Sequence, residues 1–257
     1  MTRKSRPCAA VILAAGVGSR LRNVVDGTPK GLIEVADESL VARSVRLLRR
    51  QGIERIIIVA GYRAELYHAF AQDHQVEVVD NNDFATSSTL SSLAIALGRT
   101  HEDFMLLESD LLYEERALSL LIEHPHPTAV LVSQFTGAGD EVWVEARNGE
   151  LLHMAKRELR PPEACGEFVG ISKVAAADGA ALLAMHESCS ASTARKMHYE
   201  EHGLIWLAQQ RRVDVCLAKE LLWGEVDDAS HYDRITSYLA PSLLKLETPN
   251  VEVAPLV

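Results

Sequence analysis

The sequence has no long apolar run and only four cysteines, and each shortage excludes a class of protein. No stretch approaches the roughly 20 consecutive apolar residues that a membrane-spanning helix needs. Cys8, Cys165, Cys189 and Cys216 are scattered and form no C-x-x-C pair. That spacing indicates neither a zinc site nor a disulfide framework. We therefore expect a protein of the reducing cytoplasm that has no membrane partner.

Positive charge is also scarce, because 26 lysines and arginines face 36 acidic residues and the formal net charge is −10. This balance argues against broad binding to nucleic acid or to anionic membranes, although it permits a local pocket for one small anion. Arg3, Lys4 and Arg6 precede a short apolar run, as they would in a signal peptide. Glycines and arginines follow that run at once, which favours a first strand over a targeting segment.

Several catalytic signatures are missing as well. The ten histidines form neither H-E-x-x-H nor H-x-E…C-x-x-C, so no zinc-enzyme motif is present. There is no G-x-S-x-G elbow and no Ser-His-Asp grouping. The glycines near the N-terminus do not end in G-K-[ST], as a P-loop would. Their spacing also differs from the G-x-G-x-x-G of Rossmann dehydrogenases, whose loop is not basic.

The first half does contain a regular alternation of apolar strands and helical segments. Expected strands are residues 9–13, 55–62, 76–80 and 103–110; expected helices are 39–51, 63–72 and a segment that begins at Ser87 or Ser88. Such alternation predicts a parallel sheet with helices on both faces.

The regular alternation of strands and helices ends after about residue 126. Strand-like segments cover 128–135, 140–146, 150–156 and 167–174, with Asn148-Gly149 as a hairpin turn. Helical segments at 176–188 and 200–210 are followed by strands at 213–218 and 221–228. We predict a single α/β domain over residues 1–240, made of the halves 1–125 and 126–240, and a C-terminal tail at 241–257. The second half adds a small antiparallel extension to the sheet.

Three informative stretches follow predicted strands: the loop after Leu13, Asp110, and the pair Asp227-Asp228. Ligands of open parallel sheets bind outside the carboxyl ends of the strands, so these stretches are expected to meet. Two carboxylates at such an edge suit Mg²⁺. The sequence does not separate Asp227 from Asp228 as the second ligand. In a competing interpretation, Asp110 and Asp227 each cap the helix that follows.

The loop after Leu13 combines small residues with positive charge. Ala14, Ala15, Gly16 and Gly18 allow backbone N–H groups to approach a phosphate closely. Arg20 and Lys30 add cationic side chains. The competing interpretation is a glycine-rich turn with solvated basic residues, since short glycine patterns are weak evidence.

ILAAGVGSRL followed by TPKGLIEV resembles the L-A-A-G-x-G-x-R…P-K signature of nucleotidyltransferases that make activated sugars and alcohols. The resemblance continues through GIERIIIVAGY, LLESDLLYE and WGEVDDASHYDRI, and spans most of residues 8–236. NNDFATSSTLSSL, ESDLLYEERAL and EVDDASHYDRI look most like phosphocholine and 2-aminoethylphosphonate cytidylyltransferases. The resemblance implies a Rossmann-like, mostly parallel mixed sheet of the nucleotide-diphospho-sugar transferase type. Residues 1–125 would be its nucleotide-binding half and 126–240 its acceptor-binding half.

The resemblance also implies roles for individual residues. The nucleotide-binding positions are Leu13, Ala14, Ala15, Gly16, Gly18, Asn81 and Ser88. Arg20 and Lys30 would be catalytic, and Asp110 and Asp227 would bind Mg²⁺. The acceptor-binding candidates are Trp143, Lys156, Glu167, Tyr199, Glu200, Trp223 and Glu225. Aromatic faces and acids hold cationic amines, although strand aromatics usually belong to a core and acids are usually solvated. Relatives commonly carry asparagines where this chain has TSSTLSS, so CTP and UTP both stay open as the nucleotide.

Joining a phosphate or phosphonate to the α-phosphorus of a nucleotide brings two anions together. A phosphate acceptor whose second pKa is about 6 is already ionised at neutral pH and needs no strong general base. The negative charges of the acceptor and the nucleotide must, however, be neutralised and the two groups aligned. We therefore expect Mg²⁺-dependent transfer of CMP from CTP to 2-aminoethylphosphonate or phosphocholine, with release of pyrophosphate. Two alternatives remain, namely an enzyme that uses UTP or CTP on a sugar 1-phosphate or another metabolite, and a regulatory nucleotide-binding module without turnover. The sequence leaves a homodimer possible.

Overall fold

β1 (Ala9–Ala14) shows how the sequence builds the centre of the molecule. All six of its residues are buried, and successive side chains enter two different cores. Ile12 packs with one core and Val11 with the other, because neighbouring residues of a strand point to opposite faces. A strand that is apolar on both faces requires helices on both sides, as the alternation predicted.

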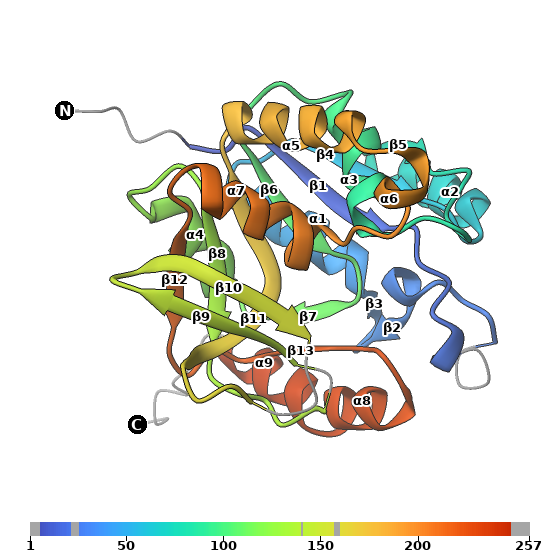
Figure 1. Cartoon of the computed structure of the whole chain (residues 1–257). Coiled ribbons are helices and arrows are strands. Elements are labelled where there is room, and N and C mark those ends of the chain that lie inside the picture. The colour runs from blue at the N-terminus through green and yellow to red at the C-terminus, as the bar shows by residue number, and fades with distance from the viewer. Residues whose placement is uncertain (1–5, 22–25, 140, 157–159, 248–257) are drawn as a thin grey trace, which may run out of the picture.

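The computed structural model describes residues 6–21, 26–139, 141–156 and 160–247. Its centre is a nine-stranded mixed sheet in the order β5-β4-β1-β6-β11-β8-β12-β10-β9 (Figure 1). The other strands are β4 (Arg55–Ala60), β5 (Glu77–Asp80), β6 (Phe104–Glu108), β8 (Ala129–Ser133), β9 (Val142–Arg147), β10 (Glu150–Lys156), β11 (Ala164–Val174) and β12 (Asp214–Ala218). β5, β4, β1 and β6 run parallel, which confirms the prediction for the first half.

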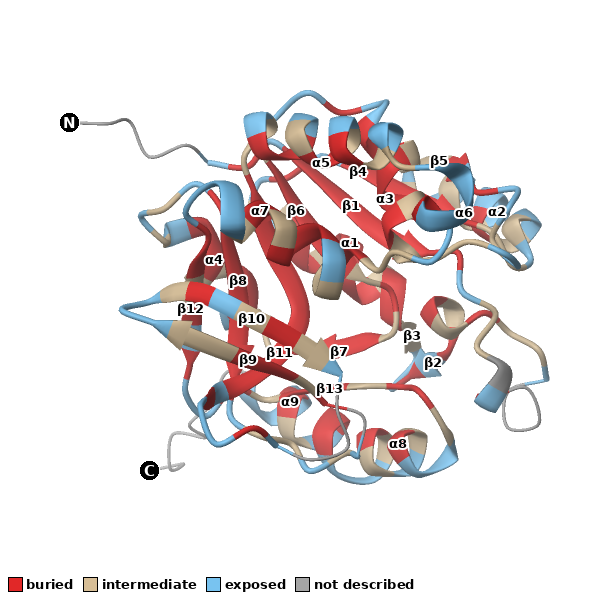
Figure 2. Cartoon of the chain, viewed as in Figure 1, coloured by how far each residue is buried: buried red, intermediate tan, exposed pale blue. Residues whose placement is uncertain are grey.

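Helices cover both faces of this sheet, and Figure 2 shows the central strands buried between them, whereas β9 and β10 are partly exposed. The helices are α1 (Leu40–Arg50), α2 (Ala64–His74), α3 (Thr89–Leu97), α4 (Arg116–Glu123), α5 (Ala176–Ser188), α6 (Ala191–Ala194), α7 (Ile205–Gln210), α8 (Ala229–Arg234) and α9 (Ala240–Glu247). α1 and α4 pack on the face that holds Ile12, whereas α3, α5 and α7 pack on the face that holds Val11. No helix in the described part of the chain has the length and apolar character to cross a bilayer.

The second half supplies the predicted antiparallel extension. Pairings run from β11 to β8, β12, β10 and β9 and back to β11, so these five strands form a closed circuit. Asn148 and Gly149 both have positive φ, as a tight hairpin between β9 and β10 requires. β11 changes register between Phe168 and Ser172, where Gly170 has φ +80°.

Some boundaries differ from those expected. The strand expected at 103–110 ends at Glu108, because the chain turns at Ser109-Asp110 and starts the short strand β7 (Leu111–Tyr113). The strand expected at 221–228 is only β13 (Trp223–Glu225), which pairs with β7. The helix expected at 200–210 is π-helical from Tyr199 to Leu204 and continues as α7. β2 (Glu34–Val35) and β3 (Glu38–Ser39) form a further small sheet.

The first residues of the expected tail belong to α9. Leu243 of this helix is buried in a third apolar cluster with Leu40 and Val226. Glu247, at its end, forms an ion pair with Arg43 of α1. The rest of the expected tail, 248–257, lies outside the described residues.

Candidate active site

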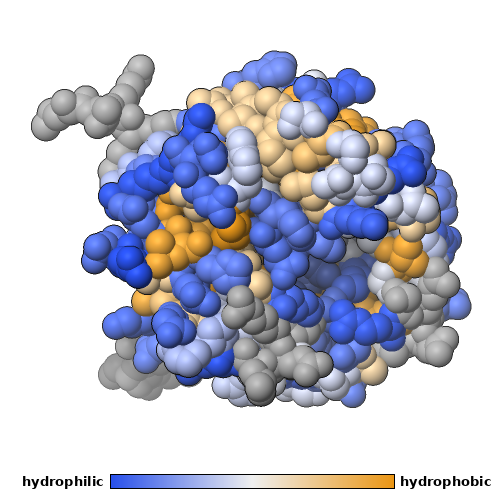
Figure 3. All heavy atoms as spheres, in the orientation of Figure 1, coloured by the Kyte–Doolittle hydropathy of each residue, from blue (hydrophilic) through white to orange (hydrophobic). Residues whose placement is uncertain are grey.

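A cavity of about 320 Å³ lies at the carboxyl ends of β1 and β6, where the three stretches were expected to meet. Its lining residues are Leu13, Ala14, Ala15, Gly16, Gly18, Lys30, Tyr67, Phe84, Ser87, Ser88, Thr89, Ser92, Glu108, Ser109, Asp110 and His198. Figure 3 shows a hollow near the middle of one face, with mostly hydrophilic side chains around it. The structure thus brings the loop after β1, the start of α3 and the turn after β6 together around one space.

Glycines are placed where this wall leaves no room for a side chain. Gly18 has φ +59°, in the left-handed region, and a Cβ there would lie 3.0 Å from Cγ of Lys30. At Gly61, after β4, a Cβ would lie 2.8 Å from the carbonyl oxygen of Ala15. Gly16 is different, because nothing lies within 4 Å of its Cβ position. That open space allows a ligand to approach the backbone of the loop.

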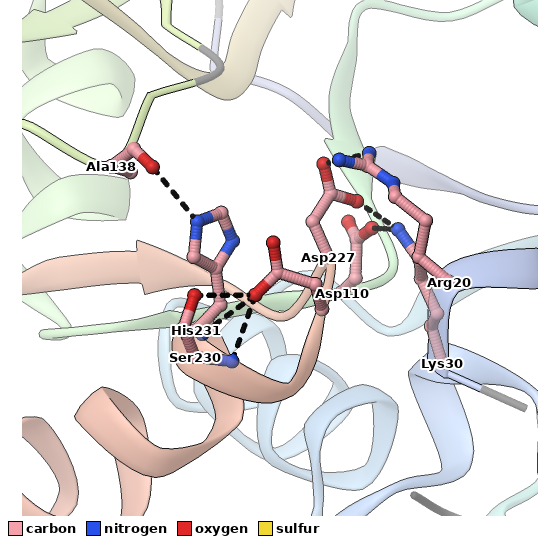
Figure 4. A network of polar contacts seen from close by, with 8 residues as sticks. Arg20, Lys30, Asp110, Ala138, Asp227, Ser230 and His231 are labelled. Atoms are coloured by element: carbon pink, nitrogen blue, oxygen red, sulfur yellow. Dashed lines mark hydrogen bonds and ion pairs between the residues drawn. The ribbon is translucent and has the colours of Figure 1, made fainter. Parts of the chain in front are cut away.

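Lys30 lies between the two predicted metal ligands (Figure 4). Its Nζ is 3.0 Å from Oδ2 of Asp110 and also donates a hydrogen bond to Oδ1 of Asp227. Nη2 of Arg20 is 2.7 Å from Oδ2 of Asp227. The side chain of Lys30 is 19% exposed, whereas that of Arg20 is 55% exposed. All four residues expected at the reaction centre therefore form one network.

The small sheet of β7 and β13 explains how the two aspartates meet. Asp110 directly precedes β7, and Asp227 follows β13 after one further residue. The two strands are antiparallel, and the N–H of Val226 donates to the carbonyl oxygen of Asp110 at 2.9 Å. Both carboxylates therefore lie at the same end of the ladder.

Asp227 and Asp228 face different partners. Oδ1 of Asp228 accepts from the N–H of Ser230 at 2.9 Å and from the N–H of His231 at 3.0 Å, so Asp228 is the N-cap of α8. The hydrogen bond from the Ser230 side chain, with those from the two N–H groups, lowers the pKa of Asp228. The capping interpretation of Asp227 is therefore wrong. It is also wrong for Asp110, since Glu115 occupies the N-cap of α4.

The positive charges of Arg20 and Lys30 balance the negative charges of Asp110 and Asp227. Burial alone would lower the pKa of Lys30, but the charges and hydrogen bonds of Asp110 and Asp227 outweigh burial and raise that pKa above its usual range. Lys30 is therefore protonated at neutral pH. Two cations and two carboxylates neutralise each other across the network. A polyanion that bound the cations would leave the carboxylates available to a metal cation.

The predicted nucleotide-binding residues Asn81 and Ser88 lie on different sides of the cavity wall. Asn81 is buried behind the wall, where its Nδ2 donates to Oγ of Ser87 at 3.0 Å and to Oγ of Ser92 at 2.9 Å. Its Oδ1 accepts from the N–H of Asp83 at 3.0 Å. Ser88 lines the cavity and occupies the N-cap position of α3 without a capping hydrogen bond from its side chain. Asn81 therefore holds Ser87 and Ser92, two residues that line the cavity with Ser88.

Tyr199 contacts the cavity lining through Glu108, a residue that the sequence analysis missed, and Glu200 contacts it through Thr89. The hydroxyl of Tyr199 donates to Oε1 of Glu108 at 2.9 Å. Oε2 of Glu200 accepts from Oγ1 of Thr89 at 3.2 Å, and the same Oγ1 accepts from the N–H of Tyr199 at 3.0 Å. Burial, together with the charges of Asp110 and Glu200, raises the pKa of Glu108 to about 8. An acid at the end of the otherwise apolar run FMLLE was the available signal.

The other acceptor-binding candidates occupy varied positions, and neither tryptophan belongs to the cavity lining among the described residues. Trp143 in β9 is buried, with its ring centroid 5.1 Å from that of Phe135. Trp223 is buried in the core beneath β7 and β13.

The three remaining candidates are charged. Glu167 is buried in β11 and accepts hydrogen bonds from the N–H and Oγ1 of Thr136, at 2.7 and 3.1 Å. The backbone N–H of Lys156 donates to Oε1 of Glu201 at 2.7 Å. Glu225 pairs with Leu111 in the small sheet, two residues before Asp227. Glu167 thus anchors the loop after β8, while Glu225 lies close to the predicted metal ligands along the chain.

A metal ion at this site would have two protein carboxylates as ligands. In the described residues there is no group of three or more acidic, histidine or cysteine side chains that could enclose a metal. Mg²⁺ usually binds proteins through one or two carboxylates and takes its other oxygen ligands from water and substrate phosphates. The donor set of Asp110 and Asp227 fits Mg²⁺ in that manner.

Known proteins resemble this chain in sequence and in structure. It is 32% identical to CMP-5'-(3-aminopropyl)phosphonate synthase of Streptomyces rubellomurinus over 132 residues, which are 50% of this chain and 21% of that protein. It is 37% identical to choline-phosphate cytidylyltransferase of Streptococcus pneumoniae over 84 residues, 33% of this chain and 37% of that one. The chain thus matches well under half the length of these curated relatives.

The inositol-1-phosphate CTP transferase of T. maritima superimposes with a TM-score of 0.80 at 21% identity, over 96% of this chain and 99% of that one. This likeness confirms the predicted fold class, a mixed sheet flanked by helices of the nucleotide-diphospho-sugar transferase type. The model of the MobA-like NTP transferase domain matches residues 10–213, which include the glycine-rich loop, Lys30 and Asp110. The predicted resemblance to nucleotidyltransferases is confirmed, and this chain belongs to the family of MobA-like NTP transferase domains.

Proposed function

We propose that this protein is a Mg²⁺-dependent cytidylyltransferase, which transfers CMP from CTP to a small phosphonate or phosphorylated amino alcohol and releases pyrophosphate. The observation that carries this proposal is the single network of Lys30, Arg20, Asp110 and Asp227 beside a cavity walled by the glycine-rich loop. The functions of the S. rubellomurinus and S. pneumoniae relatives support cytidine as the base and a phosphorus acid as the acceptor.

The chemistry needs little more than these groups. An oxygen of the acceptor phosphonate or phosphate forms a bond to the α-phosphorus of CTP while the bond from that phosphorus to pyrophosphate breaks. The attacking oxyanion carries no proton, so a general base is not required. Lys30 and Arg20 neutralise the phosphate oxygens, and the bare backbone around Gly16 lets the nucleotide lie close to β1.

Asp110 and Asp227 would hold the Mg²⁺, which supplies charge stabilisation on phosphate oxygens when it is bound. Both carboxylates pair with Lys30 in this structure. On binding, the triphosphate would become a partner of Lys30, and the metal cation would become a partner of the two carboxylates. Lys30 then retains anionic partners throughout, which keeps it protonated. The role of this lysine is to hold charge and position rather than to transfer a proton.

A panel of nucleotides and acceptors tests the proposal. The protein is incubated with Mg²⁺ and each of CTP, UTP, ATP and GTP, combined with 2-aminoethylphosphonate, phosphocholine, inositol 1-phosphate or glucose 1-phosphate. Products are read by mass and by pyrophosphate release. We expect CMP adducts of the amine-bearing acceptors, and none when EDTA replaces Mg²⁺. CTP binding without turnover on every acceptor would support the regulatory module instead.

Transfer of CMP to a phosphorylated polyol is the second candidate. The likeness to the T. maritima inositol-1-phosphate CTP transferase extends over nearly the whole chain, and the two predicted tryptophans do not line the cavity. Faster turnover of inositol 1-phosphate than of either amine-bearing acceptor would establish this candidate and rule out the first.

A further inference from the structure

The cavity lining combines groups of different chemical character. Lys30 in this lining pairs with Asp110 and Asp227, so anionic phosphorus groups are accommodated beside it. Glu108, Thr89 and His198 also line the wall. An acceptor that carries both an anion and a cation would match both kinds of group.

Besides Asp110, Glu108 is an acid in this lining. It is the last residue of β6, two positions before Asp110, and it is only partly buried because its carboxylate borders the cavity. Tyr199 donates to its Oε1 at 2.9 Å. Among the described residues no lysine, arginine or histidine forms an ion pair with it. An acid in such a site gains most from a cationic ligand.

The surroundings of Glu108 fix its position. Gly170, at the register change of β11, has φ +80°, and a Cβ there would lie 3.0 Å from Oε2 of Glu108. Tyr199 is buried, and its N–H is itself held by Thr89. Glu200, which accepts from the same threonine, is a second acid, and its charge contributes to the raised pKa of Glu108. Tyr199 is therefore a positioning residue for the Glu108 carboxylate.

The kind of cation follows from hydrogen-bonding capacity. A primary ammonium has three N–H donors for carboxylate oxygens, whereas a trimethylated ammonium has none and is best held by aromatic faces. The lining of the cavity includes the carboxyl groups of Glu108 and Asp110 and several hydroxyl groups, as well as the rings of Tyr67, Phe84 and His198, and neither Trp143 nor Trp223 is part of that lining in the described chain. A neutral polyol would leave the acids without a counter-charge.

From this arrangement we propose that Glu108 determines acceptor specificity by binding a primary ammonium, so that the acceptor is an aminoalkyl phosphonate or phosphate rather than a choline or polyol ester. This inference rests on the proposed cytidylyl transfer and adds to it the chemical class of the acceptor. Glu200 reinforces the negative potential, and Tyr199 orients the carboxylate that meets the amine.

Steady-state kinetics with three matched acceptors test the proposal. 2-Aminoethylphosphonate, ethylphosphonate (which lacks the amine) and phosphocholine are each supplied with CTP and Mg²⁺. For the unaltered protein we expect kcat/KM with aminoethylphosphonate to exceed the other two by about 10- to 100-fold, as a charged hydrogen-bonded contact predicts. In Glu108→Gln we expect this advantage to disappear mainly through a higher KM, while turnover of ethylphosphonate changes little.

Control variants separate specificity from folding. Glu150→Gln removes a charge from a glutamate outside the cavity, where it pairs with Arg212, and should leave all three acceptors unchanged. Tyr199→Phe should raise KM for the amine less than Glu108→Gln does. If Glu108→Gln fails to fold, the ranking of the three acceptors by the unaltered protein still tests whether the site prefers a primary ammonium.

The outcomes distinguish the inference from the function on which it rests. If ethylphosphonate or phosphocholine reacts as well as aminoethylphosphonate, cytidylyl transfer stands and the assignment to Glu108 is overturned. If CTP yields no pyrophosphate with any phosphonate or phosphate acceptor, the proposed function fails, and the assignment fails with it.

Discussion

At the scale of residues, neighbours with the same chemistry have different tasks. Asp227 points to Lys30 and Arg20, whereas Asp228 turns to the first N–H groups of α8. The sequence located the acidic pair correctly at the end of a strand but did not separate its members, because an i to i+1 change reverses the direction of a side chain. The geometry of the turn before α8 decides which of the two carboxylates faces the cationic side chains of Arg20 and Lys30.

Asp227→Asn and Asp228→Asn therefore form a matched pair of variants. Asp227→Asn removes a predicted metal ligand and the partner of two cations, so we expect kcat to fall by about 100-fold or more if the lost electrostatic contact is worth near 3 kcal/mol. Asp228→Asn should retain activity and stability, because asparagine caps helices about as well as aspartate. Pyrophosphate release and thermal unfolding measure the two effects. Equal loss of activity in both variants would contradict the assignment.

Substitutions of two glycines in the loop after β1 form a second matched pair of variants. Gly18→Ala introduces a side chain at φ +59° against Lys30, so we expect a loss of stability of about 1–2 kcal/mol even without ligand. Gly16→Ala places its methyl in open space and should leave the melting temperature unchanged. It should nevertheless weaken CTP binding, measured by calorimetry, because the methyl occupies the approach to the backbone. Unchanged CTP affinity in Gly16→Ala would show that the nucleotide lies elsewhere.

At the scale of elements, the sequence predicted long regular segments better than short ones. The parallel strands and the Asn148-Gly149 hairpin follow directly from apolar runs and turn residues, and both are confirmed. The strand at 103–110 was expected to end two residues later than it does, since nothing local marks the turn at Ser109. β7 and β13 are stabilised by pairing with each other across the chain, which periodicity alone does not reveal.

The docking of α9 gives a prediction about pH. Burial would raise the pKa of Glu247, but the hydrogen bond from Arg43 and the charges of Arg43, Arg46 and Arg50 outweigh it and lower that pKa. A carboxyl with a lowered folded-state pKa stabilises the fold above its unfolded pKa, and this stabilisation is lost as the pH falls through the folded pKa. We expect Glu247→Gln to lower Tm at pH 7 by about 2–4 °C, for a contribution near 1 kcal/mol.

The deficit of Glu247→Gln should shrink progressively as the pH falls below the ordinary glutamate range, because the unaltered residue then becomes protonated as well. Calorimetry across that range measures it. Glu54→Gln is the matched control, since Glu54 is 78% exposed and pairs loosely with Arg49 at 3.7 Å. A deficit that is independent of pH would show that Glu247 contributes packing rather than charge.

At the scale of the whole molecule, the fold gathers one charge network from three segments that are distant in the sequence. Arg20, Lys30, Asp110 and Asp227 follow strands or lie on the loop between them, and the rule for carboxyl ends of a parallel sheet was enough to predict their meeting. The same rule did not reveal Glu108, because that residue lies within a strand and its role depends on a bend in β11 and on the π-helical segment that carries Tyr199. Contacts of this kind depend on packing between elements, so Glu108 and its partners were harder to predict than the charge network.

The balance of charges in the network predicts a joint effect of metal and nucleotide on stability. CTP alone would take the cations from Asp110 and Asp227 and leave two carboxylates facing each other, and Mg²⁺ alone would meet carboxylates already occupied by Lys30. Each ligand should therefore shift Tm little by itself. Together, at about 100 times their Kd, they should stabilise the fold by about 2.7 kcal/mol, or roughly 5–10 °C for a chain of this size. Thermal unfolding with CTP and EDTA, with Mg²⁺, and with both measures this coupling. Additive shifts from the separate ligands would show that the acids and bases do not act as one site, and Asp227→Asn should abolish the joint effect.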